Sequence, residues 1–256
     1  MITLEQVAIS YGDKSILREV NARFETGSFT SIIGVNGSGK STLLKTIAGL
    51  HPYRGNIYLD GKELRSYARK ERAQRLAYLP QVRQIPQMDV ATLVAHGRFP
   101  HLGFAKQLTS RDRRLIDEAV TETNIEALLD RKVTELSGGE RQRVYLAMAI
   151  TQDADAILLD EPTTFLDIHY QLETIEILRK LNRRGRTILM VAHDLQQAFA
   201  FADMVCLLHN GTILAAQPPQ DLCRSPLLPE VFNVTLTPTP PGSSRALYDY
   251  QLNRID

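Results

Sequence analysis

Alternating apolar and polar positions near the N-terminus predict antiparallel strands. Residues 2–9 and 16–24 alternate with the period of two that strands show, and a short glycine-containing turn joins them. Residues 56–64 predict a hairpin that turns on Asp60 and Gly61, because this dipeptide suits a two-residue turn. The first part of the chain therefore predicts hairpins around one strand–loop–helix unit.

The middle of the chain changes to a charged, helical pattern. From about Ser66 onward strand signals are scarce, and residues 113–129 carry apolar side chains at helical spacing. We therefore expect a mostly helical subdomain. Its expected bounds are 83–155, inserted into an α/β core formed by residues 1–82 and 156–256.

Strand–helix alternation returns in the C-terminal part. Residues 156–159 and 187–192 are apolar runs, and a strand without polar alternation is typical of a parallel sheet covered on both faces. Earlier in the chain, residues 30–33 predict a short strand that ends at a glycine. Residues 204–208 and 212–215 predict a hairpin. The fold class is thus α/β, a parallel sheet with an N-terminal antiparallel β portion and a helical insertion. The remaining expectations are a loop over 237–244 and a last short strand over 246–252.

Composition is that of an ordinary globular protein. The 256 residues are 43% hydrophobic and 23% charged, with a formal net charge of +1, so nothing global attracts nucleic acid or anionic lipid. The basic residues between Arg65 and Arg75 predict a solvated helix face, with a nucleic-acid patch as the weaker alternative.

No run approaches the ~18 apolar residues of a membrane span, and residues 1–10 do not resemble a signal peptide. A role at a membrane would therefore require a partner.

The two cysteines indicate no metal or redox site. Cys206 lies in an apolar run and Cys223 follows at no C-x-x-C spacing. A reducing compartment is the simpler expectation.

A phosphate-binding loop is the first chemical motif. Residues 34–41 match G-x-x-x-x-G-K-[ST], between a predicted strand and a predicted helix. Glycines let backbone N–H groups point at an anion near the positive end of the helix. Lys40 would meet the β- and γ-phosphates of ATP, and the Ser41 hydroxyl would bind Mg²⁺. The alternative is a glycine-rich turn capped by Ser41.

The residues predicted to bind ATP are Gly34, Asn36, Gly37, Ser38, Gly39, Lys40, Ser41 and Thr42. A P-loop NTPase core follows from this motif.

Two carboxylates follow the apolar run 156–159. Because ligands of open parallel sheets bind at the carboxyl ends of strands, Asp160 is expected to hold Mg²⁺ and to face the same site as Lys40. Glu161 could orient or deprotonate the attacking water. The alternative is an ordinary turn, since Pro162 comes next.

A third motif starts a second helix. Ser137 and Glu140 form an S-x-x-E capping box, which explains these two residues but not Gly138 and Gly139 in the first helical turn. Glycines there suit a ligand that approaches bare backbone at a helix N-terminus.

The motif at residues 136–143 resembles the signature motif of ABC ATPases, and the resemblance extends along nearly the whole chain. Tyr11 falls where the aromatic residue of that family stacks on adenine. Gln81 corresponds to the Q-loop glutamine, Asp167 to the D-loop aspartate and His193 to the switch histidine. The alternatives are structural: a strand-end tyrosine, a turn glutamine and a hydrogen-bonded histidine at a strand end.

The resemblance implies a head-to-tail homodimer with two ATP molecules between the subunits. Ser137, Gly138, Gly139 and Asp167 would then complete the ATP site in trans. Glu161, His193 and Gln81 would be the catalytic residues, and Ser41, Gln81 and Asp160 the Mg²⁺ ligands. The implied partners are integral membrane permease subunits and, through them, a substrate-binding protein, with no nucleic acid. The implied location is peripheral, at the cytoplasmic face of the cell membrane.

Two short sequence features indicate one subgroup of the family. They are Phe165 before Leu166 and Asp167, and the segment Gly97–His101. Both resemble the corresponding segments of importers of iron–siderophore complexes, haem and cobalamin. Val35 departs from the proline that is frequent at its position in the family. The rival interpretations are a P-loop kinase, a soluble ABC protein acting on ribosomes or DNA, and an exporter ATPase. A kinase would not explain residues 137–139.

Overall fold

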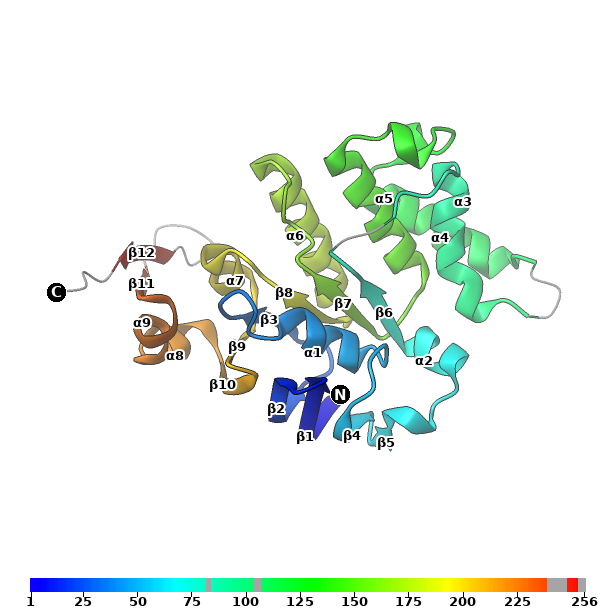
Figure 1. The fold of residues 1–256 in the computed structure, drawn as a ribbon. Helices are drawn as coiled ribbons and strands as arrows, with labels where there is room; N and C mark the ends of the chain where they lie inside the picture. Colours follow the sequence, from blue (N-terminus) through cyan, green and yellow to red (C-terminus); the bar gives the residue numbers. More distant parts are fainter. Residues whose placement is uncertain (82–83, 104–106, 239–247, 253–256) are drawn as a thin grey trace. The chain divides into compact units, whose positions relative to one another are not determined.

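The protein divides into two compact units. The structure is a computed structural model that describes residues 1–81, 84–103, 107–238 and 248–252. One unit consists of Met1–Ser66 and Thr187–Asp256, and the other of Tyr67–Arg186 (Figure 1).

The first unit begins with an antiparallel sheet of strand order β2-β1-β4-β5. The strands are β1 (Ile2–Tyr11), β2 (Lys14–Phe24), β4 (Arg54–Leu59) and β5 (Lys62–Glu63). On β1 the apolar side chains of Ile2, Leu4, Val7 and Ile9 are buried, as the alternation predicts. The expected hairpins are confirmed.

The second sheet of this unit positions the phosphate loop. The order β10-β9-β3-β8 places β3 parallel to both β8 and β9, while β9 and β10 form the expected hairpin. The bounds are β3 (Phe29–Ile33), β8 (Thr187–Val191), β9 (Met204–His209) and β10 (Thr212–Gln217). Every residue of β3 and β8 is buried, because the sheet is covered on both faces. The helices are α1 (Lys40–Ile47) and α7 (Leu195–Phe201).

The C-terminal segment adds two helices and a hairpin. These are α8 (Pro219–Cys223), α9 (Leu227–Phe232), β11 (Val234–Pro238) and β12 (Tyr248–Leu252). The expected last strand is confirmed over 248–252. The loop expected over 237–244 was wrong in its start, because β11 extends to Pro238. Thr237 and Pro238 pair with Asp249 and Tyr248, since proline is tolerated at a strand end. Residues 239–244 of that loop lie outside the described residues.

The second unit contains a parallel strand pair. β6 (Leu76–Leu79) pairs with β7 (Ala156–Asp160), and the short helix α2 (Arg69–Arg75) precedes β6. The sequence did not predict β6, which lies inside the expected α/β core 1–82 but beyond Ser66, where strand signals are scarce. Four residues carry too little periodicity to be recognised, and the strand exists because its backbone pairs with β7.

Helices fill the rest of this unit. They are α3 (Val90–Ala95), η2 (His96–His101), α4 (Ser110–Thr123), η3 (Glu126–Leu128), η4 (Val133–Glu135), α5 (Gly138–Thr151) and α6 (Ile168–Arg183). Both α3 and α4 pack on α5 (Figure 1). The expected helix 113–129 was wrong in extent. Asn124 adopts a left-handed conformation (φ 52°) and ends α4, because asparagine tolerates this C-terminal position.

The bounds 83–155 for a helical subdomain stay a proposal. In the described parts of 83–155 no β-strand occurs, while the unit defined by contacts also contains β6, β7 and α6.

Of the helices in the described ranges, none combines the length and apolar character that a membrane crossing requires.

Candidate functional site

The phosphate loop connects β3 to α1 within the first unit. The Lys40 ammonium group donates to the carbonyl oxygens of Gly34 at 2.8 Å and Val35 at 3.1 Å, so the lysine folds back over the loop. The buried Ser38 hydroxyl has no hydrogen-bond partner among the described residues. A phosphate oxygen would satisfy this hydroxyl, because buried polar groups are normally paired. The loop therefore fits a bound phosphate group.

Two loop glycines are required by their surroundings. A Cβ on Gly34 would lie 2.1 Å from the carbonyl oxygen of Leu208 in β9. Gly39 has a φ of 105°, and its Cβ would lie 2.9 Å from the Leu17 side chain in β2. Both strands thus force the loop backbone to be free of side chains at these points.

The other predicted phosphate-loop residues lie on the same short segment. Asn36 and Gly37 are exposed on the loop, while Ser41 and Thr42 lie half-buried in the first turn of α1. Backbone N–H groups at such a helix start have no intrahelical partner and favour an anion.

Tyr11 and His193 also belong to the first unit. Tyr11 ends β1, is exposed, and its hydroxyl lies 3.1 Å from His51 Nε2. Sequence analysis did not connect His51 with this tyrosine. His193 follows the end of β8 and is exposed, and the next residue, Asp194, caps α7 by accepting from Gln197 N at 3.1 Å.

The acidic strand end lies in the second unit. Asp160 is the last residue of β7 and is 2% exposed, and the Tyr78 hydroxyl donates to its Oδ2 at 3.4 Å. Glu161 has a left-handed backbone (φ 49°), which is uncommon for a residue with a long side chain. The chain therefore turns sharply where the strand ends.

Glu161 accepts two hydrogen bonds at one oxygen atom. Gln81 Nε2 donates to Glu161 Oε2 at 2.7 Å, and Thr164 Oγ1 donates to the same atom at 3.0 Å. The fold thus brings together two predicted residues that are 80 positions apart in the sequence. Thr164 was missed by sequence analysis; its spacing of three from Glu161 within a turn was the available signal.

The second helix start, at α5, is a complete capping box. Ser137 Oγ accepts from Glu140 N at 3.3 Å, and Ser137 N donates to Glu140 Oε2 at 2.8 Å. The hydrogen bonds from Ser137, together with Arg131 3.1 Å from the other oxygen, lower the pKa of Glu140. The carboxylate is therefore held charged at the helix N-terminus.

The two glycines of this helix differ in their surroundings. A Cβ on Gly139 would lie 2.4 Å from the Tyr170 ring, whereas a Cβ on Gly138 would meet nothing within 4 Å. Packing inside the unit accounts for Gly139. It does not account for Gly138, which leaves bare backbone open to a ligand at the helix start.

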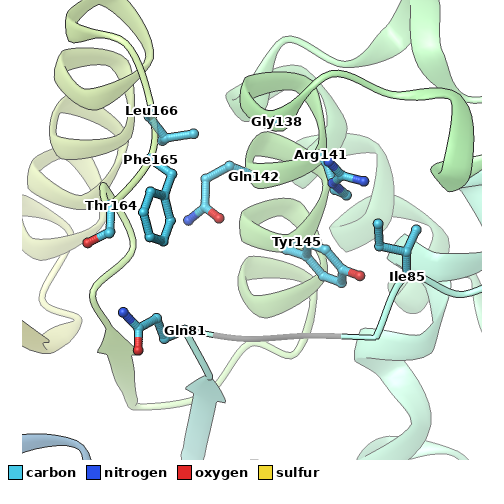
Figure 2. A pocket seen from close by; sticks show the side chains of 9 residues that line it. All are labelled: Gln81, Ile85, Gly138, Arg141, Gln142, Tyr145, Thr164, Phe165 and Leu166. Atoms are coloured by element: carbon cyan, nitrogen blue, oxygen red, sulfur yellow. The ribbon is translucent and has the colours of Figure 1, made fainter.

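A cavity of about 530 Å³ joins several of these segments (Figure 2). Its lining residues come from the segment after β6, from α5 and from the turn before α6; they are Gln81, Ile85, Gly138, Arg141, Gln142, Tyr145, Thr164, Phe165 and Leu166. Phe165 is 96% exposed with a left-handed backbone (φ 64°). Asp167 begins α6 as its N-cap and accepts from Tyr170 N at 3.1 Å.

No ready-made metal centre exists in the described ranges. There, no three or more histidine, cysteine or carboxylate side chains are grouped so that they could hold a metal ion. The oxygen donors of Ser41 and Asp160 are of the type that Mg²⁺ prefers, usually together with substrate phosphates and water.

Comparisons with known proteins agree with these motifs. The family model described as ABC transporter matches residues 17–164. The iron(3+)-hydroxamate import ATP-binding protein FhuC of Bacillus subtilis (strain 168) is 40% identical over 91% of this chain and 88% of its own. The ferric enterobactin transport ATP-binding protein FepC of Escherichia coli (strain K12) is 39% identical over 90% of this chain and 86% of its own.

Solved structures show the same fold. The cbiO1 protein of Clostridium perfringens, part of the ABC transporter complex cbiONQ, has a TM-score of 0.76 at 27% identity over 86% of this chain and 89% of that one. The dimeric bacterial ABC transporter cassette MJ0796 has a TM-score of 0.74 at 28% identity, over 86% and 99% of the two chains. With the phosphate loop, the acidic strand end and the Ser137–Gly139 helix start described above, these matches establish that the chain belongs to the ABC transporter family as an ATP-binding subunit, an ATPase whose activity is coupled to transport.

Proposed function

We propose that the chain powers an ABC importer that takes up a metal chelate, with iron–siderophore complexes as the first substrate class. The names of its relatives support this class, since they include hydroxamate and enterobactin systems. Import of haem or cobalamin, or another transport system, is the alternative. The transported molecule would bind to partner subunits and not to this chain.

The observation that carries the proposal is the helix start at Ser137. A chain with its own phosphate loop also has a second helix N-terminus that suits an anion, and a Cβ on its Gly138 would meet nothing within 4 Å. The second site is explained if it completes the ATP site of another copy. A two-fold homodimer with two equivalent ATP sites follows.

Each predicted residue has a role in this dimer. Lys40, Ser38 and the loop N–H groups would bind the phosphates, and Tyr11 would stack on adenine. Ser137, Gly138, Gly139 and Asp167 would contact ATP from the partner copy. Ser41, Gln81 and Asp160 would hold Mg²⁺, which would offset the negative charge of the phosphates.

Glu161 and His193 would act at the γ-phosphate. Glu161 is proposed to orient and deprotonate the attacking water, and the two donors at its Oε2 fix the direction of the carboxylate. His193 would contact the γ-phosphate. Closure around ATP would exclude water and place these groups in a fixed arrangement before reaction.

The remaining partners are proposals of the same kind. Integral permease subunits would bind the chain at the cytoplasmic face of the membrane, and a substrate-binding protein would act through them. ATP binding would close the dimer and hydrolysis would reopen it, which shifts the permease between conformations by a coupling free energy. No nucleic acid is required.

The test is the mass of a Glu161→Gln variant in solution with and without Mg-ATP. The variant should bind ATP without cleaving it, and should be a monomer without nucleotide and a dimer with it. Lys40→Ala in the same background is the matched control and should stay monomeric, because it loses phosphate binding. A variant that binds ATP tightly and remains a monomer would contradict the shared site and favour the kinase interpretation.

A further inference from the structure

The segment Gly97–His101 caps the far end of the helix that starts at Ser137. Arg98 Nη1 donates to the Thr151 carbonyl at 2.9 Å, and His101 Nε2 lies 2.8 Å from the Gln152 carbonyl. Thr151 is the last residue of α5 and Gln152 is its C-cap. Carbonyl groups at a helix C-terminus lack intrahelical partners and attract cationic donors.

A buried ion pair fixes Arg98 in this position. Arg98 Nε lies 2.8 Å from Asp112 Oδ1, and the side chains are only 3% and 8% exposed. The other carboxylate oxygen, Asp112 Oδ2, accepts from Thr109 N at 2.8 Å and from Thr109 Oγ1 at 2.6 Å. A buried ion pair whose carboxylate also accepts hydrogen bonds at its other oxygen is held in one geometry.

Close backbone contact locks the segment against the same helix. A Cβ on Gly97 would lie 2.3 Å from the Met148 carbonyl oxygen, so η2 and α5 touch without an intervening side chain. Gln74 Nε2 also donates to the Pro100 carbonyl at 2.8 Å, which ties η2 to α2. The segment is therefore anchored on several sides, while Phe99 between these anchors is 57% exposed.

We infer that Arg98 is a positioning residue for ATP hydrolysis, which acts by fixing α5 and thereby the ATP-contacting residues Ser137–Gly139 at its other end. The inference rests on the proposed function, in which these residues contact ATP bound to another copy. A helix of 14 residues is about 20 Å long and behaves as one element. Displacement of its C-terminus would shift its N-terminus relative to the γ-phosphate. Small displacements of groups that contact the reacting phosphate lower the reaction rate strongly.

The experiment removes the cap in the Glu161→Gln background. The double variant Arg98→Met with Asp112→Leu replaces both buried charges by apolar groups of similar volume, so that no charge is left unpaired. We expect ATP-driven dimerisation to weaken about tenfold, while the ATP affinity of the monomer stays within about twofold. His101→Ala removes the second bond to the end of α5 and should weaken ATP-driven dimerisation by less than the double variant does. Because His101 is only half-buried, this variant keeps the test valid if the double variant folds poorly.

Phe99→Ala is the matched control, since it changes the same segment without removing a bond to α5. It should dimerise like its parent. With Glu161 intact, the double variant should lower kcat and leave the KM for ATP unchanged, a split that a general loss of stability would not produce. Dimerisation and kcat equal to the parent in both cap variants would overturn the inference. Failure of the parent itself to dimerise would instead contradict the proposed function, and the inference with it.

Discussion

At the scale of single residues, several predicted ligand-binding side chains also have a local structural task. Ser137 caps α5, and Asp167 caps α6 by accepting from Tyr170 N. A cap accepts hydrogen bonds from the first N–H groups of its helix, the same groups that would otherwise face an anion. Substitution of such a residue therefore changes folding and binding together, and the two must be measured separately.

The adjacent glycines of α5 separate packing from ligand access. Gly139→Ala should destabilise the protein by about 2 kcal/mol, because its Cβ would overlap the Tyr170 ring. Gly138→Ala should be neutral or slightly stabilising in a helix. Urea unfolding of both variants measures this difference. Equal free energies of unfolding would show that the Tyr170 contact does not constrain Gly139.

The two thiols should be poorly reactive in the folded protein. Burial raises the pKa of Cys206 to about 12 and that of Cys223 to about 11, so both are almost fully protonated near neutral pH. Labelling with a disulfide reagent should be slow in native protein and fast in denaturant, with Cys223 the faster native thiol because it is only half-buried. Rapid native labelling of Cys206 would contradict its buried position.

At the scale of elements, an N-terminal cap and an ion pair share one carboxylate. Asp112 closes the capping box of α4 with Thr109 and binds Arg98 of η2 with its other oxygen. The hydrogen bonds from Thr109 and the nearby Arg98 lower the pKa of Asp112 from 3.8 to about 2. One side chain thus connects α4, η2 and, through Arg98, the end of α5.

This connection predicts a pH-dependent stability. Because the folded pKa is below the unfolded one, the stabilisation by Asp112 is complete above about pH 4 and is lost as the pH falls towards about 2. Asp112→Asn should reduce the free energy of unfolding by about 3 kcal/mol near pH 7, since it leaves Arg98 without its charge partner. In urea titrations the difference from the parent should shrink below about pH 4. A difference that stays constant with pH would assign the effect to packing.

At the scale of the whole molecule, nucleotide binding should stabilise the protein. A ligand at about 100 times its Kd adds about 2.7 kcal/mol, so saturating Mg-ATP should raise the Tm of the Glu161→Gln variant. Removal of Mg²⁺ with EDTA should diminish this shift. Ser41→Ala should respond to ATP but lose most of the difference between Mg²⁺ and EDTA. A shift in Ser41→Ala that still depends fully on Mg²⁺ would contradict the metal-binding role of Ser41.

The sequence by itself determined the motifs and most elements. Amphipathic alternation and apolar runs predict the hairpins and buried strands because side-chain periodicity follows backbone geometry, and the phosphate loop and capping box are local patterns of consecutive residues. These local motifs therefore carry the resemblance to the ABC ATPase family. The short strand β6 and the end of α4 at Asn124 could not, since pairing and a left-handed turn depend on what surrounds them.

Only the tertiary structure decided which distant residues meet. Gln81 and Thr164 converge on Glu161, Tyr170 packs against Gly139, and Arg98 reaches the end of α5. Each contact joins segments whose separation along the chain is set by the path of the fold, and no local propensity encodes it. The sequence thus determined the chemistry available to this protein, and the packing of its elements decided which groups hold that chemistry in place.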